Sequence, residues 1–486
     1  MRISQLDLGI LLLYLAGVTL LGVWFRRGQK DLSDYFLGGR SAPAWALACS
    51  IVATETSTLT IIGTPAIAYG GDLGFLQVVL GYLVARGVLC VVLIPRYFQG
   101  QFYTAYQLME KRFGARVKSA AAGIFVVTRA LAEGVRIAAV GKVVSVVFGT
   151  GDRAAIAIVT ILTLFYTFEG GMKAVIWTDV LQLAIYLTGS LAAFWLLLHK
   201  IPDGWHGVTQ AAAASGKLRI FDFTFSLTRS YTFWSGTIGG TFLTMASHGT
   251  DQTLVQRLLA AKSERDSKIA LLGSGVIVFF QFALFSLIGA MLFVFYQHGA
   301  HGIVPSDPDK NFPEFIVTEM PKGLVGLVLA AIVAVAMSNA SGSLNSLASS
   351  SMMDFGQRKD AADPAAQRGM LRTSRRVTLV WGCILGILGL VHWGPVLVAG
   401  LTITSMTYGA MLGLFLLGIW NRRANSTGAL AGMAVGLAAM IAVRLFTPLA
   451  WTWYVLAGTL ITFIAGSAAS ATAGSDNAMT TETLSE

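Results

Sequence analysis

Two polar stretches interrupt long apolar segments of this chain. The first runs from Ala53 to Thr60 with the sequence ATETSTLT, and the second runs from Thr244 to Asp251 with the sequence TMASHGTD. Unpaired backbone groups are costly in hydrocarbon, so irregular backbone at membrane depth survives only where it lines a cavity or is buried in protein. Paired interruptions in corresponding halves of a membrane protein are typical of secondary transporters, whose site lies near the bilayer midplane. The sequence therefore predicts two broken helices beside a central site.

The rest of the chain is apolar enough for a multi-pass membrane protein. Hydrophobic residues make up 55% of its 486 residues and charged residues only 12%, whereas a soluble protein carries about 25% charged residues. Apolar stretches of about 20 residues, the length that crosses a bilayer core, recur along the chain. We predict an all-α membrane protein with about 13 transmembrane helices, at 6–25, 43–71, 73–95, 119–148, 153–170, 174–199, 231–251, 268–297, 322–354, 375–393, 395–420, 426–446 and 449–470.

The net charge of +10 is explained by membrane topology, without a nucleic-acid partner. Basic residues gather in alternate loops, for example at 26–30, 111–118 and 358–376, whereas the loops between them carry few. Cytoplasmic loops have an excess of Lys and Arg, so we predict an N-terminus outside and a C-terminus in the cytoplasm. The expected location is the plasma membrane, which in a bacterium is the inner membrane.

The interruptions open two halves of five predicted helices each, once the first helix and the last two are set aside. An odd number of helices per half reverses the orientation of the second half, which gives an inverted-topology repeat. The predicted organisation is an extra helix and first cytoplasmic loop at 1–42, a five-helix repeat at 43–199, an extracellular loop at 200–230, a second five-helix repeat at 231–420, two C-terminal helices at 421–473 and a disordered cytoplasmic tail at 474–486.

A third polar cluster lies within the predicted helix 322–354. Helical spacing puts five of its residues on one face, namely Val335, Ser338, Asn339, Gly342 and Ser346. Hydroxyl and carbonyl oxygens suit a dehydrated alkali cation, and a broken helix offers unwound carbonyls as further ligands. Small polar residues also let membrane helices pack closely, but the two interruptions in the same chain favour an ion site.

Several motifs make the chain resemble the sodium:solute symporter family. They are DYFLGGR at 34–40, GGMKAVIWTD at 170–179, TDQ at 250–252, VQR at 255–257 and AAK at 260–262. The resemblance runs from about residue 34 to residue 420, and it implies a LeuT-like fold of five plus five helices with sodium as the coupling ion. The family includes carriers of glucose, proline, sialic acid, iodide and monocarboxylates. The segment IGTPA at 62–66, followed by Tyr69, is most similar to the iodide, monocarboxylate and vitamin branch.

The resemblance also implies the ligands of the main sodium site. They are the carbonyl oxygens of Ala53, Thr56 and Val335 and the side-chain oxygens of Ser338 and Asn339. The family commonly has a hydroxyl residue where this chain has Asn339, whose amide oxygen is also able to coordinate sodium.

A second sodium is the less favoured alternative. Some family members hold one near an aspartate that matches Asp179, together with hydroxyls on the ion-site helix. Ser341 is present, but Gly342 stands where another hydroxyl is expected. The sequence therefore favours one sodium, with Asp179 either on the cytoplasmic exit route of the ion or in a structural role at a helix end.

Ionisable residues inside predicted membrane helices are costly and indicate function. Glu55 lies in the first interruption, where sodium/proline carriers of the family also have an acidic residue. Arg129, Glu133 and Arg136 share one helix face, and in sialic acid carriers an arginine on this helix holds the substrate carboxylate through its planar guanidinium. The alternative is an internal Arg129–Glu133 ion pair, which leaves Arg136 to face Glu55 or a substrate anion. Arg86 has no assigned role.

These observations predict a sodium-coupled symporter that imports a small carboxylate or zwitterion by alternating access. We expect a monomer without a prosthetic group or enzymatic activity. The alternatives are a proton-coupled carrier of the same fold, in which His248 or Glu55 relays protons, and a transporter-like membrane sensor. The substrate-binding candidates are Glu55, Ser57, Thr60, Gln77, Arg136, Thr244 and Ser247.

Overall fold

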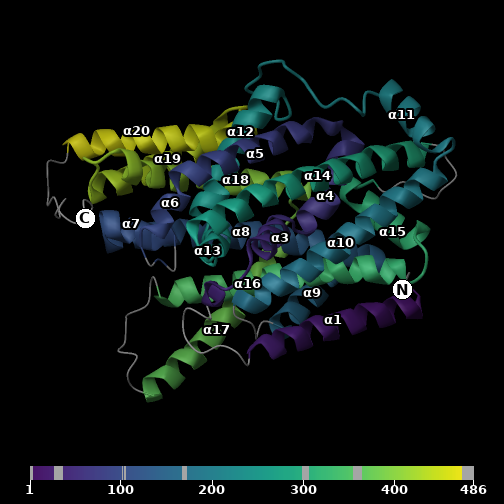
Figure 1. Ribbon diagram of the computed structural model, residues 1–486, viewed down its shortest axis with the longest axis horizontal. Helices are drawn as coiled ribbons and strands as arrows, with labels where there is room; N and C mark the ends of the chain where they lie inside the picture. The colour runs from purple at the N-terminus through teal and green to yellow at the C-terminus, as the bar shows by residue number, and fades with distance from the viewer. Residues whose placement is uncertain are drawn as a thin grey trace.

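The chain forms a bundle of long helices (Figure 1). The computed structural model describes residues 4–26, 37–100, 102, 105–166, 172–297, 306–353 and 364–472. Within this part of the chain the regular structure is helical, and the β-type pairing is limited to one isolated bridge between Ala42 and Ala261. The predicted all-α class is confirmed. The predicted tail 474–486 lies outside the described residues.

Each of the 13 predicted membrane segments falls on a described helix, and the second segment is divided between two. The helices are α1 (Gln5–Arg26), α3 (Ala44–Glu55) with α4 (Thr58–Gly70), α5 (Leu76–Val92), α8 (Ala115–Phe148), α9 (Asp152–Tyr166), α10 (Met172–Lys200), α12 (Phe233–Thr250), α14 (Glu264–Gln297), α16 (Leu324–Met353), α17 (Pro364–Gly389), α18 (Val396–Trp420), α19 (Ser426–Phe446) and α20 (Tyr454–Thr472). Six described helices are long and apolar enough to cross a membrane unaided, or seven if α3 and α4 count as one bent span. The total of 13 crossings therefore stays a prediction.

Short helices connect the long ones. They are α6 (Ile94–Phe98), α7 (Ala105–Phe113), α11 (Gly204–Ala214), α13 (Gln252–Leu259) and α15 (Asn311–Glu319), with 3-10 turns η1 (Gly38–Arg40), η2 (Leu73–Phe75), η3 (Pro308–Lys310) and η4 (Trp451–Trp453).

The first predicted break is confirmed. Helix α3 ends at Glu55 and α4 begins at Thr58, with an angle of 64° between them. Thr56 and Ser57 have extended backbone between the two helices. Ser57 and Thr60 form a reciprocal capping box at the start of α4, an arrangement that satisfies amides that a helix N-terminus leaves unpaired. The sequence STLT therefore restarts the helix in a new direction.

The second predicted break is placed wrongly by the sequence. Helix α12 stays regular through Thr250, and the chain leaves helical geometry only at Asp251 (φ −80°, ψ 121°). The polar residues remain in the helix because their hydroxyls bond carbonyls of the preceding turn; Thr250 Oγ1, for example, donates to the Ala246 carbonyl at 2.7 Å. Asp251 then caps α13 by accepting from the Thr253 amide at 2.8 Å.

Helices α5 and α12 form a tight pair because glycines lie in their contact. A Cβ atom on Gly81 of α5 would lie 2.2 Å from the Thr237 carbonyl oxygen of α12. A Cβ atom on Gly240 of α12 would lie 2.1 Å from the Val78 carbonyl oxygen of α5. Such small residues let membrane helices approach closely, and this pair holds two of the buried ionisable side chains described below.

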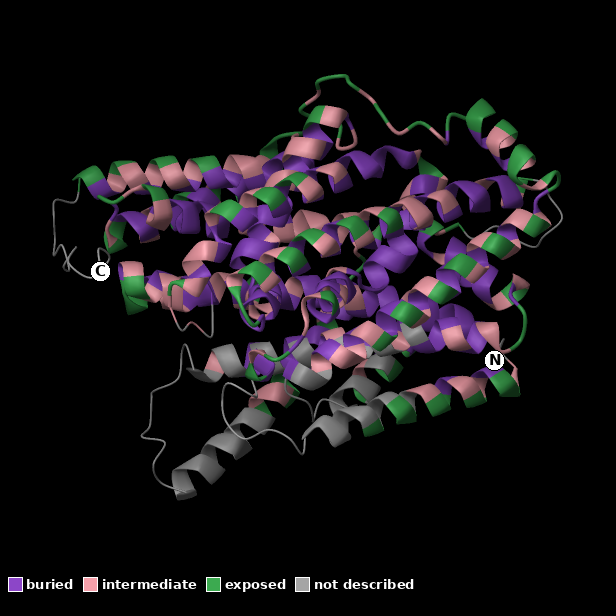
Figure 2. Cartoon of the chain, in the orientation of Figure 1, coloured by how far each residue is buried: buried purple, intermediate pink, exposed green. Residues whose placement is uncertain are grey.

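The broken helix lies in the interior of the bundle. Helix α3 packs on α10 and α14, α4 packs on α14, α18, α8 and α16, and α8 in turn contacts α16, α17 and α18. Figure 2 shows α3 and α4 mostly buried, whereas α1 and α20 present exposed faces at the edges of the bundle. The unwound residues of the break therefore face protein and not the outer surface.

Candidate ion and solute site

A cavity of about 260 Å³, counted to its open mouth, lies where the start of α4 meets α8 and α16. Its lining residues are Ser57, Thr58, Glu133, Arg136, Ile137, Val140, Ala336, Asn339 and Ala340. It brings together three of the predicted site residues, Ser57, Arg136 and Asn339, from three different segments of the chain. The site therefore begins at the first break, as expected for a discontinuous helix that lines a binding site.

Several polar atoms at this cavity have no hydrogen-bond partner within the described residues. They are Thr58 Oγ1, Arg136 Nε and Asn339 Nδ2, all buried. Buried polar groups are nearly always satisfied, and an unsatisfied one costs about 1–3 kcal/mol. Three such groups at one cavity indicate a place where a polar ligand completes the hydrogen bonding.

The break also frees backbone oxygen. In a continuous helix the Ser57 amide would donate to the Ala53 carbonyl, but here it donates to Thr60 Oγ1 at 3.4 Å. The Ala53 carbonyl thereby loses its helical partner. Thr56 is extended and buried, and its hydroxyl accepts from Gln281 Nε2 of α14 at 2.6 Å, which fixes the break against that helix.

The predicted ligands on α16 lie on one helix that contacts α4. Val335 is buried and Asn339 lines the cavity. The side chains of Ser338 and Ser341 lie outside the described residues, so their part in sodium binding stays a prediction.

Arg136 forms an ion pair within its own helix. Its Nη1 lies 3.2 Å from Glu133 Oε2, and the Ser343 hydroxyl of α16 also donates to this oxygen at 2.8 Å. Arg129 Nε donates to the same hydroxyl at 2.8 Å. The alternative of an internal Arg129–Glu133 ion pair is therefore wrong, because Ser343 lies between the two groups and Arg136 takes the carboxylate.

Arg86 is the main residue that the sequence left unassigned. It is fully buried in α5, and its Nη2 lies 2.5 Å from Glu55 Oε2. His248 Nε2 of α12 lies 3.5 Å from the same carboxylate oxygen, and Arg86 Nε donates to Ser274 of α14 at 3.2 Å. Glu55 therefore faces Arg86 and not Arg136. An arginine inside an apolar segment needs a carboxylate, and this rule could have paired Arg86 with the acid in the break.

Asp179 ties three helices together. Its Oδ2 lies 3.0 Å from Arg257 Nη2 of α13 and accepts from the Ser50 hydroxyl of α3 at 2.6 Å. Arg257 Nε also donates to Ser50 at 3.0 Å, which closes the triangle. This arrangement fits the structural role at a helix end, and a role in sodium exit stays a prediction.

Gln77 is engaged by the loop before α12. Its Oε1 accepts from the Asp222 amide at 3.0 Å, and its Nε2 donates to the Tyr231 carbonyl at 2.9 Å. Of the other solute-site candidates, Thr60 belongs to the capping box, Thr244 is buried in α12, and Ser247 bonds His248 Nδ1 at 2.9 Å. Their contact with solute stays a prediction.

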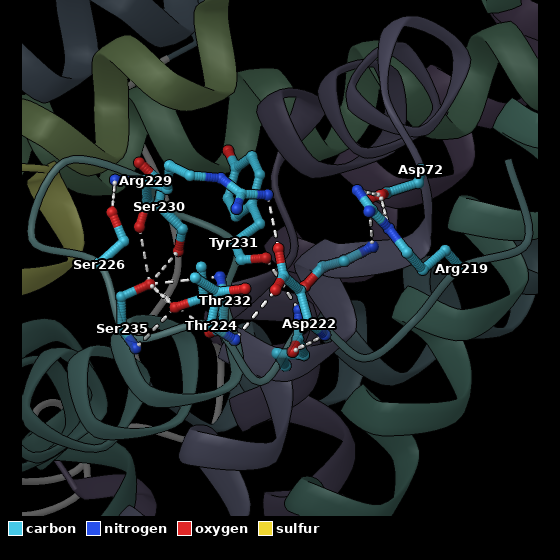
Figure 3. A network of polar contacts seen from close by, with 12 residues as sticks. Asp72, Arg219, Asp222, Thr224, Ser226, Arg229, Ser230, Tyr231, Thr232 and Ser235 are labelled. Carbon is cyan, nitrogen blue, oxygen red and sulfur yellow. Dashed lines mark hydrogen bonds and ion pairs between the residues drawn. The ribbon is translucent and has the colours of Figure 1, made fainter. Parts of the chain in front are cut away.

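Figure 3 shows that the same loop is itself a polar network. Arg219 donates to Asp72 Oδ2 through two nitrogens, at 2.9 and 2.7 Å, and Arg229 lies 2.5 Å from Asp222. Hydrogen bonds from Thr224 and the nearby Arg229 guanidinium lower the pKa of the Asp222 carboxyl. The loop is therefore a folded strap fixed to the ends of α4 and α5.

Comparison with known proteins identifies the class of this chain. The model of the sodium:solute symporter family matches residues 35–436, and the chain belongs to this family. It is a multi-pass membrane transporter with sodium as its coupling ion, and not an enzyme. The expected family, coupling ion and transport class are confirmed, and sodium is favoured over the proton and over a sensor.

Individual relatives cover almost the whole chain. The sodium/sialic acid symporter SiaT of Proteus mirabilis is 30% identical over 486 residues, which are 95% of this chain and 94% of that protein. The human sodium/iodide cotransporter is 30% identical over 90% of this chain and 69% of its own length. Human sodium-coupled monocarboxylate transporter 2 is 29% identical over 89% of this chain and 72% of its own.

Solved structures give the same result. A sodium-coupled sialic acid symporter, in a substrate-bound outward-open state with a novel sodium site, superposes with a TM-score of 0.84 at 29% identity, over 96% of this chain and 98% of that one. Mhp1, a nucleobase-cation-symport-1 transporter, superposes with a TM-score of 0.57 at 12% identity, over 90% of this chain and 95% of that one, which shows the fold alone. The helical fold is therefore shared with the sialic acid symporter and with Mhp1.

Proposed function

We propose that this protein imports a small organic carboxylate or zwitterion together with sodium. The observation that carries the proposal is Arg136, which lines the cavity at the break with its Nε unpartnered. A guanidinium meets a carboxylate with two parallel hydrogen bonds, and Arg136 keeps free donor capacity beyond its bond to Glu133. The relatives that carry sialic acid and monocarboxylates support an anionic solute.

Sodium would bind on the other side of the break. The proposed ligands are the carbonyls of Ala53, Thr56 and Val335 with the side chains of Ser338 and Asn339. An ion held by both the break and α16 would draw these two elements together, which closes the cavity beside Arg136 and couples the ion to the solute. Alternating access then follows from movement of the broken helix against α16.

We infer the remaining organisation from the same pattern. The halves 43–199 and 231–420 would form the inverted repeat, each opened by a helix that leaves regular geometry, at Thr56 in the first and at Asp251 in the second. The charge distribution supports an N-terminus outside and a C-terminus in the cytoplasm of the plasma membrane. The transporter would act as a monomer.

Uptake into proteoliposomes tests the solute class. The purified protein would be supplied with labelled N-acetylneuraminate, pyruvate, proline or glucose under an inward sodium gradient, with potassium in place of sodium as the control. Accumulation of a carboxylate-bearing solute in sodium alone is expected. Accumulation of glucose, or of any solute equally well in potassium, would overturn the proposal.

A substitution tests the sodium ligands. Ser338→Ala removes one proposed oxygen ligand, so the sodium concentration for half-maximal uptake should rise by about tenfold, the equivalent of about 1.4 kcal/mol. Unchanged sodium activation in this variant would show that the ion binds elsewhere.

A further inference from the structure

A second cavity lies on the other side of Arg136. It has a volume of about 400 Å³, counted to its open mouth, and it lies between α7, α8, α12 and α18. Its polar lining consists of Tyr106, Thr128, Arg129, Arg136, Thr250, Asp251, Thr404 and Tyr408. Arg136 lines both cavities, so it stands at the boundary between them.

Arg129 dominates the chemistry of this second cavity. It is only 9% exposed. Among the described residues its guanidinium bonds one neutral group, the Ser343 hydroxyl at 2.8 Å, and forms no ion pair. A buried cation without an anion is strongly unfavourable, and in a membrane protein such a residue is a candidate for a functional site.

The two nearby carboxylates are already engaged. Glu133 pairs with Arg136. Both oxygens of Asp251 accept hydrogen bonds, Oδ1 from the Thr253 amide at 2.8 Å and Oδ2 from the Tyr408 hydroxyl at 2.9 Å. Neither carboxylate forms an ion pair with Arg129 among the described residues, so an anion that enters the cavity would give the guanidinium its first direct ionic partner.

We propose that Arg129 forms a second anion site, which receives the carboxylate of the solute after it leaves Arg136 and before it reaches the cytoplasm. This inference rests on the proposed function. The two arginines are seven residues apart on α8 and share a face, which corresponds to a step of about 10 Å along the helix. Arg129 is the nearer of the two to the basic end of α8, which the charge pattern predicts to be cytoplasmic.

The second site differs from the first in its need for sodium. None of the proposed sodium ligands lines the cavity of Arg129. A carboxylate held there has left the ion site, so its binding should not depend on sodium. This difference separates the two sites in one measurement.

Equilibrium binding of radiolabelled pyruvate to the purified full-length protein tests the proposal, because a single carboxylate suffices to meet a guanidinium. The wild type should show a sodium-dependent component from Arg136 and a weaker component that persists in potassium. Arg129→Gln should lose the potassium component by tenfold or more and keep the sodium-dependent one. Arg136→Gln should do the reverse. Arg129→Lys, which keeps the charge but not the fork, should retain part of the binding.

The matched control is Arg116→Gln, an exposed arginine at the start of the same helix, which should change neither component. A wild type without binding in potassium, or potassium binding that persists in Arg129→Gln, would overturn the second site. A wild type that binds pyruvate in potassium but shows no sodium-dependent component would instead contradict the proposed solute class. Thermal unfolding of each variant shows whether it is folded. If Arg129→Gln is unfolded, the binding measured with Arg129→Lys takes its place in the test.

Discussion

At the scale of single residues, the buried arginines determine what the site is able to bind. Arg86 is neutralised by Glu55, Arg136 is paired with Glu133 but keeps a free Nε, and Arg129 meets only a hydroxyl within the described residues. The cost of a buried charge falls with each partner that it gains. The three side chains therefore differ in how much they gain from an anionic solute, and Arg86 gains least.

The Glu55–Arg86 pair should behave as a unit. Glu55→Gln and Arg86→Gln each leave one uncompensated buried charge and should each lower stability by about 3–5 kcal/mol, whereas the double variant should recover most of this loss. Thermal unfolding in detergent measures the effect. The largely exposed pair Lys268–Glu264 on α14 is the control, because its removal should cost about 0–1 kcal/mol. Additive losses in the Glu55/Arg86 double variant would contradict the pairing.

Replacement of Arg136 by lysine should weaken solute binding. An ammonium cannot reproduce two parallel hydrogen bonds to a carboxylate, so Arg136→Lys should weaken solute affinity by about 1–3 kcal/mol, the usual value for hydrogen bonds to charged groups. Half-saturation of sodium-driven uptake measures it, with Arg116→Lys as the control. An unaltered half-saturation constant would exclude Arg136 from carboxylate binding.

At the scale of elements, the helices and the first break follow from local chemistry. The apolar length and the STLT capping sequence are sufficient to predict α3 and α4, because caps and hydrocarbon act locally. The sequence does not predict the regular geometry of Thr244–Thr250, because it does not show whether a hydroxyl bonds its own helix or unwinds it. Nor does it show that Gln77 holds the strap or that Glu55 selects Arg86, since both are contacts between distant segments.

Close packing of α5 against α12 gives a prediction at this scale. Gly81→Ala would place a methyl group 2.2 Å from the Thr237 carbonyl oxygen, and overpacking of this kind costs about 1–3 kcal/mol. Gly87 lies on the same helix, and no atom lies within 4 Å of the position that a methyl group would take there, so Gly87→Ala should not destabilise the protein. Thermal unfolding of the two variants compares them directly. Equal stabilities would show that α5 and α12 are not in tight contact.

At the scale of the whole molecule, the charge carried per cycle follows from the proposed stoichiometry. One sodium and one carboxylate form a neutral pair, so their joint movement should not respond to the membrane potential. One sodium with a zwitterion carries one positive charge, which is driven by about 2.3 kcal/mol per 100 mV. Currents recorded from proteoliposomes on a solid-supported membrane distinguish these cases. A transport current with a monocarboxylate such as pyruvate would indicate a second sodium and would revive the role of Asp179 and Ser341.

The two-residue gap between α3 and α4 has a mechanical consequence. Helical hydrogen bonds reach the bond from the Thr56 amide to the Val52 carbonyl on one side and resume with the bond from the Ile61 amide to the Ser57 carbonyl on the other. Within α4, Pro65 has no amide hydrogen and leaves out one further bond. Thr56 and Ser57 have extended backbone between the two helices, so a change in their backbone angles reorients α3 relative to α4 without breaking helical hydrogen bonds. Helices α3 and α4 can therefore move as two units that are joined at Thr56 and Ser57. An ion bound at the proposed site would then change the angle between α3 and α4, and neither helix would have to unfold during the transport cycle.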